Sequence, residues 1–468
     1  MMKKFPEIDV NVCKSEYCEN FSLTGCDDYI IPSFKLGFRA IHCQRCDGNS
    51  VLINNDDIRE MIFPYISLYR VKVEGRCPAC FSNVVIRYGV TAKGTSRYQC
   101  KTCQCVYSPH RSNDYDAHKN KIIELLWEGK KINDILSALK ITPATFYRKL
   151  HQIETSLEVL LRSREKKLNN TGGHSVQSNI FRQTCRVENN TGLENELLGM
   201  ISCCSKTGYV FLVSLNWTDA PLSSESHYNA KNRETEPVDI GGDDILKGIY
   251  RKYESFNKRQ SFGYFKYTDE LCSKKIIEPV VMAHFHFTKL RFISPVNIRH
   301  HFLYFDLFLR GSCLTVYGAD IREGKCDVFY VASDERLADK QYIYKGSYKI
   351  GWWSNIWHEY YCPADGGLKY LCNLTNLKND NPDEYLQISP SLNYSEAFID
   401  ALQYFFPKEK VEILTPKVLA SILSIFVKFY NYCYISPVEE ITPAQKIGLA
   451  KKKYDIETLI DGFVEGDI

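Results

Sequence analysis

The sequence contains no long apolar run and little net charge. No stretch approaches the roughly 18 consecutive apolar residues of a membrane-spanning helix, and the first residues, MMKKFPEIDVNVCK, contain no apolar segment of the kind found in signal peptides. We therefore expect a cytoplasmic protein without a membrane partner. The 59 Lys and Arg residues nearly balance the 56 Asp and Glu residues, so composition alone does not indicate nucleic acid as a partner. A chain of 468 residues is too long for one hydrophobic core and predicts several domains.

Cysteine, in contrast, is abundant, with 19 residues, and the odd number argues against a complete set of disulfides. In a reducing compartment, clustered cysteines more often bind metal. The segments CPAC and CKTC lie about twenty residues apart, a spacing typical of zinc sites, and supply Cys77, Cys80, Cys100 and Cys103. Two expected strands surround the turn at 92–94, so residues 71–112 are predicted to form a zinc ribbon with Cys105 as a spare thiol. A redox pair is the weaker alternative, because it needs only one such segment and a βαβ context.

A second cysteine set lies in residues 1–70, which we expect to form another zinc ribbon. The segments CKSEYC and HCQRC supply its four candidate ligands, Cys13, Cys18, Cys43 and Cys46. The first spacing is looser, so Cys26 and His42 remain alternative ligands. A closed site of four cysteines leaves no open coordination position, and we therefore expect structural rather than catalytic Zn²⁺.

Residues 113–163 have the pattern of a helix-turn-helix. An amphipathic helix is expected to end at Gly129, a short helix follows, and Thr142 and Pro143 suit the cap and first position of a third helix. In such a motif the last helix enters the major groove of DNA, and here it would present Thr145, Tyr147, Arg148 and Lys149. The segment from 117 to 167 has eleven Lys and Arg against six Asp and Glu. A helical hairpin packed in another core is the alternative.

Residues 164–179 are polar and contain glycine, which favours a linker. From 180 to 468 the chain is rich in aromatic residues, and expected strands are followed by expected helices, so we predict a mixed α and β domain. The stretch SCLTVYGADIR is expected to be an apolar strand with Asp320 at its end. Histidines in AHFHFTKL and RHHFLYF alternate with aromatic residues, and we expect them to be packing residues rather than metal ligands.

Four stretches, taken together and in this order, give a more specific indication. They are CPAC with RYQCKTC, then SKTGYVFLVSLNW, then LRGSCLTVYGADIR leading to CDVFYV, and finally FVKFYNYC with ITPAQKIGLAKK. In these stretches the chain resembles bacterial insertion-sequence transposases of the DDE class. The resemblance implies a ribonuclease-H-like α/β fold, so the whole chain is expected to be a multidomain α+β protein.

The resemblance also implies an active site in which three acidic residues hold two divalent ions, Mg²⁺ or Mn²⁺, for attack on a phosphodiester. Asp320 matches the place of the second acid and Glu396 that of the third. Cys203 and Cys204 stand where the first acid is expected, and a thiol is a poor ligand for Mg²⁺. Glu188 and Asp219 are alternatives, although neither lies at the expected strand position.

The sequence thus predicts a transposase-like protein that binds double-stranded DNA through zinc ribbons and a helix-turn-helix. Metal-dependent strand cleavage and transfer would follow from the resemblance, and the missing first acid favours the alternative, a catalytically inactive relative acting as a DNA-binding regulator. An RNA-binding or purely structural zinc protein is a third alternative. Proteins that resemble these transposases commonly assemble across two DNA ends. The resemblance therefore implies a homo-oligomer on DNA and a location at the nucleoid.

Overall fold

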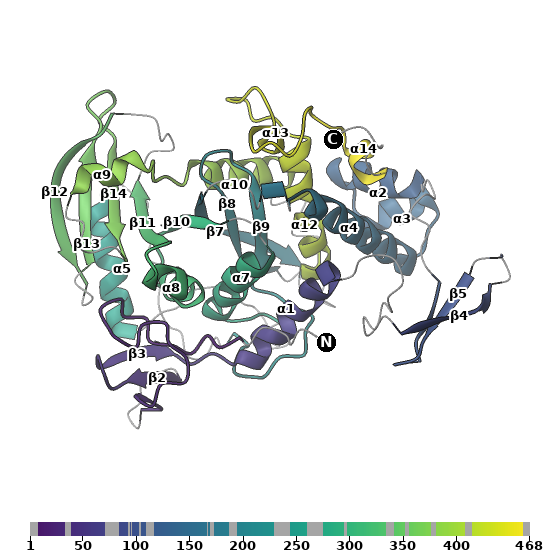
Figure 1. The fold of residues 1–468 in the computed structure, drawn as a ribbon. Helices are drawn as coiled ribbons and strands as arrows, with labels where there is room; N and C mark the ends of the chain where they lie inside the picture. The colour runs from purple at the N-terminus through teal and green to yellow at the C-terminus, as the bar shows by residue number, and fades with distance from the viewer. Residues whose placement is uncertain are drawn as a thin grey trace.

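The computed structural model describes most of the chain, and among these residues the strands form three separate sheets joined by helices (Figure 1). The described residues are 8–32, 39–70, 84–91, 94, 96–102, 104–108, 117–165, 167–168, 173–186, 194–228, 244–259, 275–293, 297–333, 341–351, 355–375, 381–407 and 414–461. No helix among them is both long and apolar enough to cross a membrane.

The first small sheet contains the amino-terminal cysteines. Its strands are β1 (Tyr29–Ile30), β2 (Ala40–Cys43) and β3 (Gly48–Val51), which pair in that order and antiparallel. Helix α1 (Asn55–Arg70) follows and packs against α7 (Pro279–Ile293), a helix that covers the large sheet described below.

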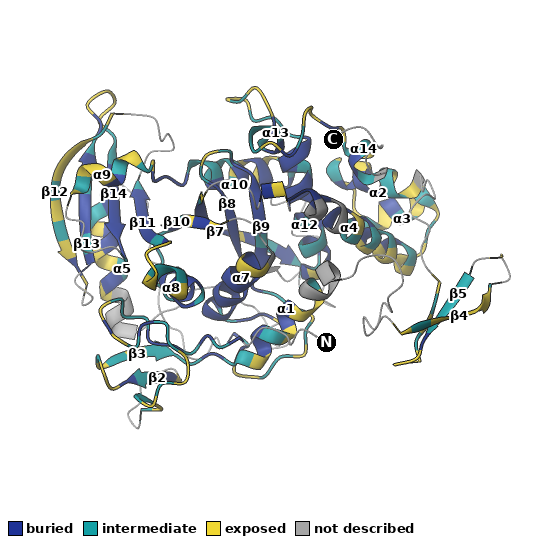
Figure 2. Cartoon of the chain, viewed as in Figure 1, coloured by how far each residue is buried: buried dark blue, intermediate teal, exposed yellow. Residues whose placement is uncertain are grey.

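The second small sheet confirms the expected hairpin around the turn at 92–94. Strands β4 (Val85–Val90), β5 (Ser96–Cys100) and β6 (Val106–Tyr107) pair antiparallel in that order. Gly94 has a φ of +78°, which a glycine adopts without strain in a tight turn. In Figure 2 the residues of this hairpin are mainly exposed or half-buried, unlike those of the large sheet.

Three helices then confirm the predicted helix-turn-helix. They are α2 (Ala117–Trp127), α3 (Ile132–Leu139) and α4 (Pro143–Glu165). Gly129 has a φ of +77° and its N–H bonds to the Leu126 carbonyl, which ends the first helix where the sequence predicts. Helix α4 is longer than a recognition helix needs to be, with 23 residues, and its second half belongs to the core of the large domain.

The large domain is built on an eight-stranded sheet in the order β12-β13-β14-β11-β10-β7-β8-β9. Strands β7 (His174–Arg186), β8 (Glu194–Cys204) and β9 (Val210–Leu215) form an antiparallel meander, while β10 (Ile298–Tyr304) and β11 (Asp327–Ser333) continue it parallel to β7. Strands β12 (Ile343–Ile350), β13 (Asn355–Tyr361) and β14 (Leu368–Asn373) extend it antiparallel.

Helices cover both faces of this sheet. Helices α7 (Pro279–Ile293) and α8 (Leu307–Arg322) pack together on one face, where His286 of α7 contacts Ser202 of β8. Helices α10 (Asn393–Phe405) and α12 (Pro416–Tyr432) lie on the other face, where Gln177 of β7 contacts the start of α10. The remaining helices are α5 (Ile245–Arg259), α9 (Pro382–Gln387), α13 (Pro443–Lys446) and α14 (Ile456–Asp461).

Two predictions about this region are wrong. The stretch SCLTVYGADIR is part of helix α8 rather than a strand, because α8 is buried on nearly all sides and therefore lacks the polar stripe of an amphipathic helix. The expected linker at 164–179 is ordered at both ends: α4 runs to Glu165, and β7 begins at His174, whose N–H bonds to the Asn297 carbonyl. The helices that we expect to follow the strands of this region are present as α10 and α12.

Candidate nucleic-acid interface and metal centre

The structure brings the four amino-terminal cysteines into one group. The Sγ atoms of Cys13 and Cys46 are 3.5 Å apart, those of Cys18 and Cys43 are 3.8 Å apart, and all four lie within 4.8 Å of one another. A tetrahedral zinc ion with Zn–S bonds of about 2.3 Å would hold its sulfurs about 3.8 Å apart, so the geometry fits Zn²⁺. Cys26 and His42 are not members of the group, and His42 contacts Asn49 and Asp47 instead.

The surroundings of these thiols shift their pKa values in different directions. Burial raises the pKa of the Cys13 thiol above its ordinary range and that of Cys46 to about 11. Burial also acts to raise the pKa of Cys43, but hydrogen bonds from the Asn20 amide and from the backbone at Arg45 and Cys46 outweigh it and lower the pKa overall. Metal binding at this site would therefore release protons from the buried thiols.

The loop between Cys13 and Cys18 is docked on the large domain by two charged residues. Glu16 forms an ion pair of 2.9 Å with Arg310 of α8, and both side chains are more than nine-tenths buried. The Lys14 ammonium lies 3.3 Å from Nε2 of His284 in α7. Burial, aided by the charge of Arg310, lowers the pKa of Lys14 to about 7. Sequence reasoning missed both residues, and their position inside the cysteine loop is the signal that could have found them.

Two glycines of α8 leave room for this loop and for Ser22, which follows it in the chain. A Cβ atom added at Gly318 would lie 1.8 Å from Oγ of Ser22, and one at Gly311 would lie 3.4 Å from the Lys14 side chain. The two glycines are seven residues apart and so lie on one side of the helix. The first cysteine group is therefore packed closely against α7 and α8.

The second cysteine set is only partly visible in the described residues. Cys77, Cys80 and Cys103 lie outside them, so the four-ligand prediction there stays a prediction. Cys100 is fully buried at the end of β5, and its N–H bonds to the Cys105 carbonyl across a tight turn.

The apolar core of the helix-turn-helix is continuous with that of the large domain. Buried residues from all three helices meet in it: Ile122, Ile123, Leu126, Ile135, Phe146, Leu150 and Ile153. Thr142 accepts a hydrogen bond of 3.3 Å from the Thr145 N–H, which confirms it as the cap of α4. Lys140 has the left-handed conformation, with a φ of +51°, and makes the turn between α3 and α4.

The four predicted DNA contacts all lie on the first half of α4. Tyr147 and Arg148 are exposed, whereas Thr145 and Lys149 are half-buried. Tyr147 packs edge-on against the buried Phe146 ring, with centroids 5.3 Å apart, so its position is fixed by the core. The helix thus presents an aromatic ring and a guanidinium group to solvent.

The second half of α4 fixes this motif to the large domain. Glu158 forms a buried ion pair of 2.8 Å with Lys428 of α12, and Glu154 accepts a hydrogen bond from Ser421 of the same helix. Tyr209, next to β9, donates a hydrogen bond of 2.6 Å to Glu165. The exposed half of α4 therefore has a set orientation relative to the sheet.

The acids expected to be catalytic are not brought together. Asp320 lies near the end of α8 and pairs with Arg291 of α7 at 3.0 Å, while Glu396 lies in the first turn of α10 on the opposite face of the sheet. Cys203 and Cys204 are buried at the end of β8, and Glu188 lies outside the described residues. Among the described residues, the cysteine group is the only set of three or more His, Cys, Asp or Glu side chains that could hold a metal ion.

A hydrogen-bond network of uncharged polar side chains joins β7 to the start of α10. The Gln177 amide oxygen accepts hydrogen bonds from the N–H groups of Tyr394 and Ser395, and its nitrogen donates to Ser391 and Asn393 at 2.9 Å each. These bonds satisfy donors at the start of α10 that have no partner within the helix. Gln177 thus positions the turn that carries Glu396, and nothing in its sequence neighbourhood indicates this role.

The histidines of AHFHFTKL and RHHFLYF belong to α7 and β10. His284, His286 and His301 are fully buried, as expected of packing residues. His286 bonds Ser202 and Ser214 at 2.9 Å each, and burial lowers its pKa well below the ordinary value. His286 therefore holds α7 on the sheet in its neutral form.

Comparison with known proteins supports the helix-turn-helix and places the chain in a family. Residues 111–152 match the family model described as the helix-turn-helix domain of resolvase. Over 78 residues the chain is 36% identical to insertion element iso-IS1N protein InsA of Shigella dysenteriae, a match that covers 84% of that protein and 16% of this chain. This chain belongs to the InsA family of insertion-element proteins. The predicted resemblance to an insertion-sequence protein with a helix-turn-helix is thereby confirmed.

A solved structure is also similar over much of the chain. It is the cryo-EM structure of a piggyBac transposase synaptic complex with hairpin DNA, with 10% identity and a TM-score of 0.25 over 87% of this chain and 70% of that one. A likeness at this level does not establish a shared fold.

Proposed function

We propose that this insertion-element protein binds double-stranded DNA by placing the exposed first half of α4 in the major groove. The observation that carries the proposal is the exposure of Tyr147 and Arg148 on a capped helix that is packed against α2 and α3 and whose second half is fixed to the large domain. Arg side chains at such positions contact guanine edges, and Lys side chains contact phosphates.

The test is binding to duplex DNA from the segments that flank the protein's own gene, with an unrelated duplex of equal length beside it. Arg148→Ala should cost about 1–3 kcal/mol on the cognate duplex and reduce its preference over the unrelated one. Lys149→Ala should weaken binding to both duplexes and lower the salt slope by about 1. Unchanged binding in both variants would reject α4 as the recognition helix.

For the large domain we propose a ribonuclease-H-like fold. Its support is the arrangement of the sheet, an antiparallel meander of β7, β8 and β9 continued by the parallel strands β10 and β11, with helices on both faces. We favour a DNA-binding regulator over an active transposase, because Asp320 and Glu396 lie on opposite faces and the start of α10 is held by the neutral Gln177.

The two activities can be separated by incubating the protein with flanking DNA and Mg²⁺ or Mn²⁺. We expect binding without cleavage. Cleavage that disappears in Asp320→Ala would overturn this choice and establish metal-dependent strand cleavage as an activity. The proposal also includes a location at the nucleoid and a homo-oligomer on DNA. Both of these parts rest on DNA binding alone.

Zinc has a structural place in this proposal. Cys13, Cys18, Cys43 and Cys46 would hold it, and the ion would cross-link the first small sheet without an open position for chemistry. Zinc measured in the purified protein at one equivalent or more per chain would support this, and a metal-free protein that folds normally would contradict it.

A further inference from the structure

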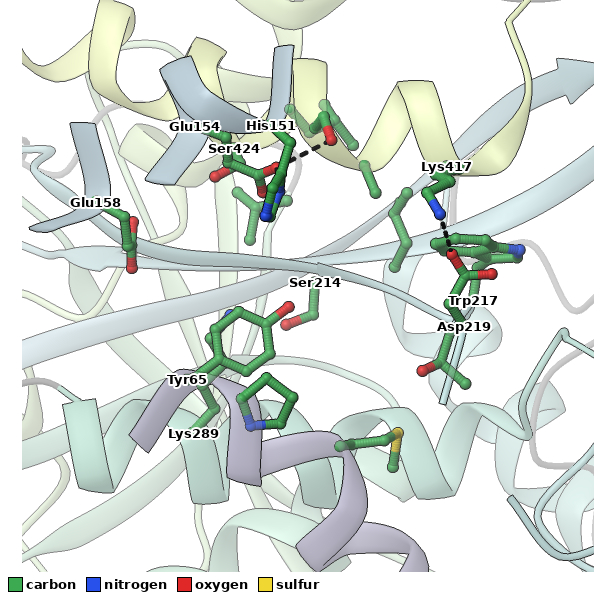
Figure 3. A pocket seen from close by; sticks show the side chains of 18 of the residues that line it. Tyr65, His151, Glu154, Glu158, Ser214, Trp217, Asp219, Lys289, Lys417 and Ser424 are labelled. Carbon is green, nitrogen blue, oxygen red and sulfur yellow. Dashed lines mark hydrogen bonds and ion pairs between the residues drawn. The ribbon is translucent and has the colours of Figure 1, made fainter. Parts of the chain in front are cut away.

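Two of the four predicted DNA contacts on α4 line a pocket that the edge of the large sheet also borders. The pocket has a volume of about 800 Å³, and Tyr147, Arg148 and His151 form one of its walls. The pocket is also lined by β9 with the residues that follow it and by α12, which supply Trp217, Asp219 and Lys417 (Figure 3). The helix face that we assign to DNA is therefore also directed toward a second element of the protein.

At the rim of this pocket a carboxylate holds two lysines. Lys417, the second residue of α12, lies 2.8 Å from one oxygen of Asp219, and Lys275 lies 3.0 Å from the other. The Lys275 ammonium also lies 6.0 Å from the centre of the Trp217 ring. All three charged side chains are substantially exposed, at 63% for Lys417, 46% for Lys275 and 39% for Asp219.

Such an exposed cluster carries one net positive charge and its ion pairs are screened by solvent, so a phosphate can compete with the carboxylate for both lysines. Inside the pocket, in contrast, the acidic side chains pair with groups other than these two lysines. Glu158 pairs with Lys428, and Glu154 accepts a hydrogen bond from the Ser421 hydroxyl. The α1 wall adds an exposed acid, Glu60. A phosphate backbone would therefore pass along the rim near α12 rather than enter the pocket or follow α1.

We propose that Lys417 and Lys275 form a second DNA contact, continuous with α4, that binds the sugar-phosphate backbone of the duplex whose major groove α4 enters. Asp219 holds the two ammonium groups in place and lowers the net charge of the surface in the absence of DNA. The inference rests on the proposed function, because without DNA on α4 the rim has no duplex to contact. It gives the large domain a direct part in DNA binding.

The sign of the effect should reverse between variants of this cluster. The Lys417→Ala, Lys275→Ala double variant should weaken binding to cognate and unrelated duplexes alike, by about tenfold, and should lower the salt slope by about 2, since each phosphate contact contributes about 0.9. Asp219→Asn should instead tighten binding to both duplexes and steepen the salt slope. The measurement is fluorescence anisotropy of the full chain at several salt concentrations.

Lys247→Ala is the matched control. Lys247 is a 71% exposed lysine of α5 that is also paired with an aspartate, Asp244, at 3.1 Å, but neither member of this pair lines the pocket. Its replacement should leave binding unchanged.

The failures are distinguishable. If Arg148→Ala weakens cognate binding while the double lysine variant behaves as Lys247→Ala does, α4 reads DNA and the rim contact is wrong. If neither Arg148→Ala nor the double variant changes binding, the proposed function itself is wrong. Weaker or unchanged binding by Asp219→Asn would contradict the role given to that carboxylate.

Discussion

The two cysteine modules have similar sequence patterns and very different surroundings. The first, around Cys13 and Cys46, is packed against α7 and α8 through a buried ion pair and two glycines. The second, the sheet of β4, β5 and β6, exposes apolar side chains, with Val90 at 56% and Tyr88 at 49%. A cysteine spacing that indicates metal binding therefore does not predict whether the module packs against another domain or exposes its side chains to solvent.

The largest effect should come from removing the first metal site. Cys13→Ser should abolish metal binding there and destabilise the large domain by more than about 4 kcal/mol, because loss of a structural metal belongs to the most damaging class of changes. Cys77→Ser, the matched change in the second module, should leave the unfolding of the large domain nearly unchanged. Chemical denaturation followed by circular dichroism measures both, and equal losses would remove the distinction between the modules.

Breaking the buried ion pair should have the next largest effect. Glu16→Ala leaves the Arg310 guanidinium buried without its carboxylate and should cost about 3–5 kcal/mol. The Glu16→Met, Arg310→Met double variant should recover much of that loss, because it removes the uncompensated charge as well. A double variant less stable than Glu16→Ala would show that the pair does not act as a unit.

Filling the space at Gly318 tests the contact directly. Gly318→Ala places a methyl group against Ser22 and should destabilise the protein by about 1–3 kcal/mol. Gly346→Ala is the control, because an added Cβ there meets no atom within 4 Å and the backbone is not in the left-handed region. Combining Gly318→Ala with Ser22→Gly should relieve the loss, and its persistence would point to a different cause.

The smallest effect is expected in the second module. Tyr88→Ser on the exposed face of β4 should change the stability of the large domain by less than about 0.5 kcal/mol, as is usual for surface positions. A larger change, measured by the same denaturation curves, would mean that this hairpin also packs against the rest of the chain.

Local features of this protein could be predicted from its sequence. The hairpin of β4 and β5, the end of α2 at Gly129 and the cap of α4 at Thr142 depend on a few neighbouring residues with strong turn or capping preferences. The grouping of Cys13, Cys18, Cys43 and Cys46 follows the same logic, since each pair lies in a short loop.

Features that depend on distant contacts could not be predicted. Helix α8 reads as a strand because the sheet, α7 and the cysteine loop bury it on nearly every side, which removes the helical polarity pattern. The docking of Glu16 on Arg310 joins residues 294 positions apart. Gln177 of β7 likewise accepts hydrogen bonds from the start of α10, more than 200 residues away in the sequence. A buried glutamine in a strand does not indicate that role.

The most direct test of the account is photo-crosslinking to cognate duplex DNA from two exposed tyrosine positions. A photoreactive phenylalanine at Tyr147, which is 39% exposed on α4, should crosslink to DNA. The same residue at Tyr17, which is 72% exposed in the first cysteine module, should not crosslink, although it is the more accessible of the two. Crosslinking at position 17 and not at 147 would contradict both the recognition role of α4 and the supporting role of the first module.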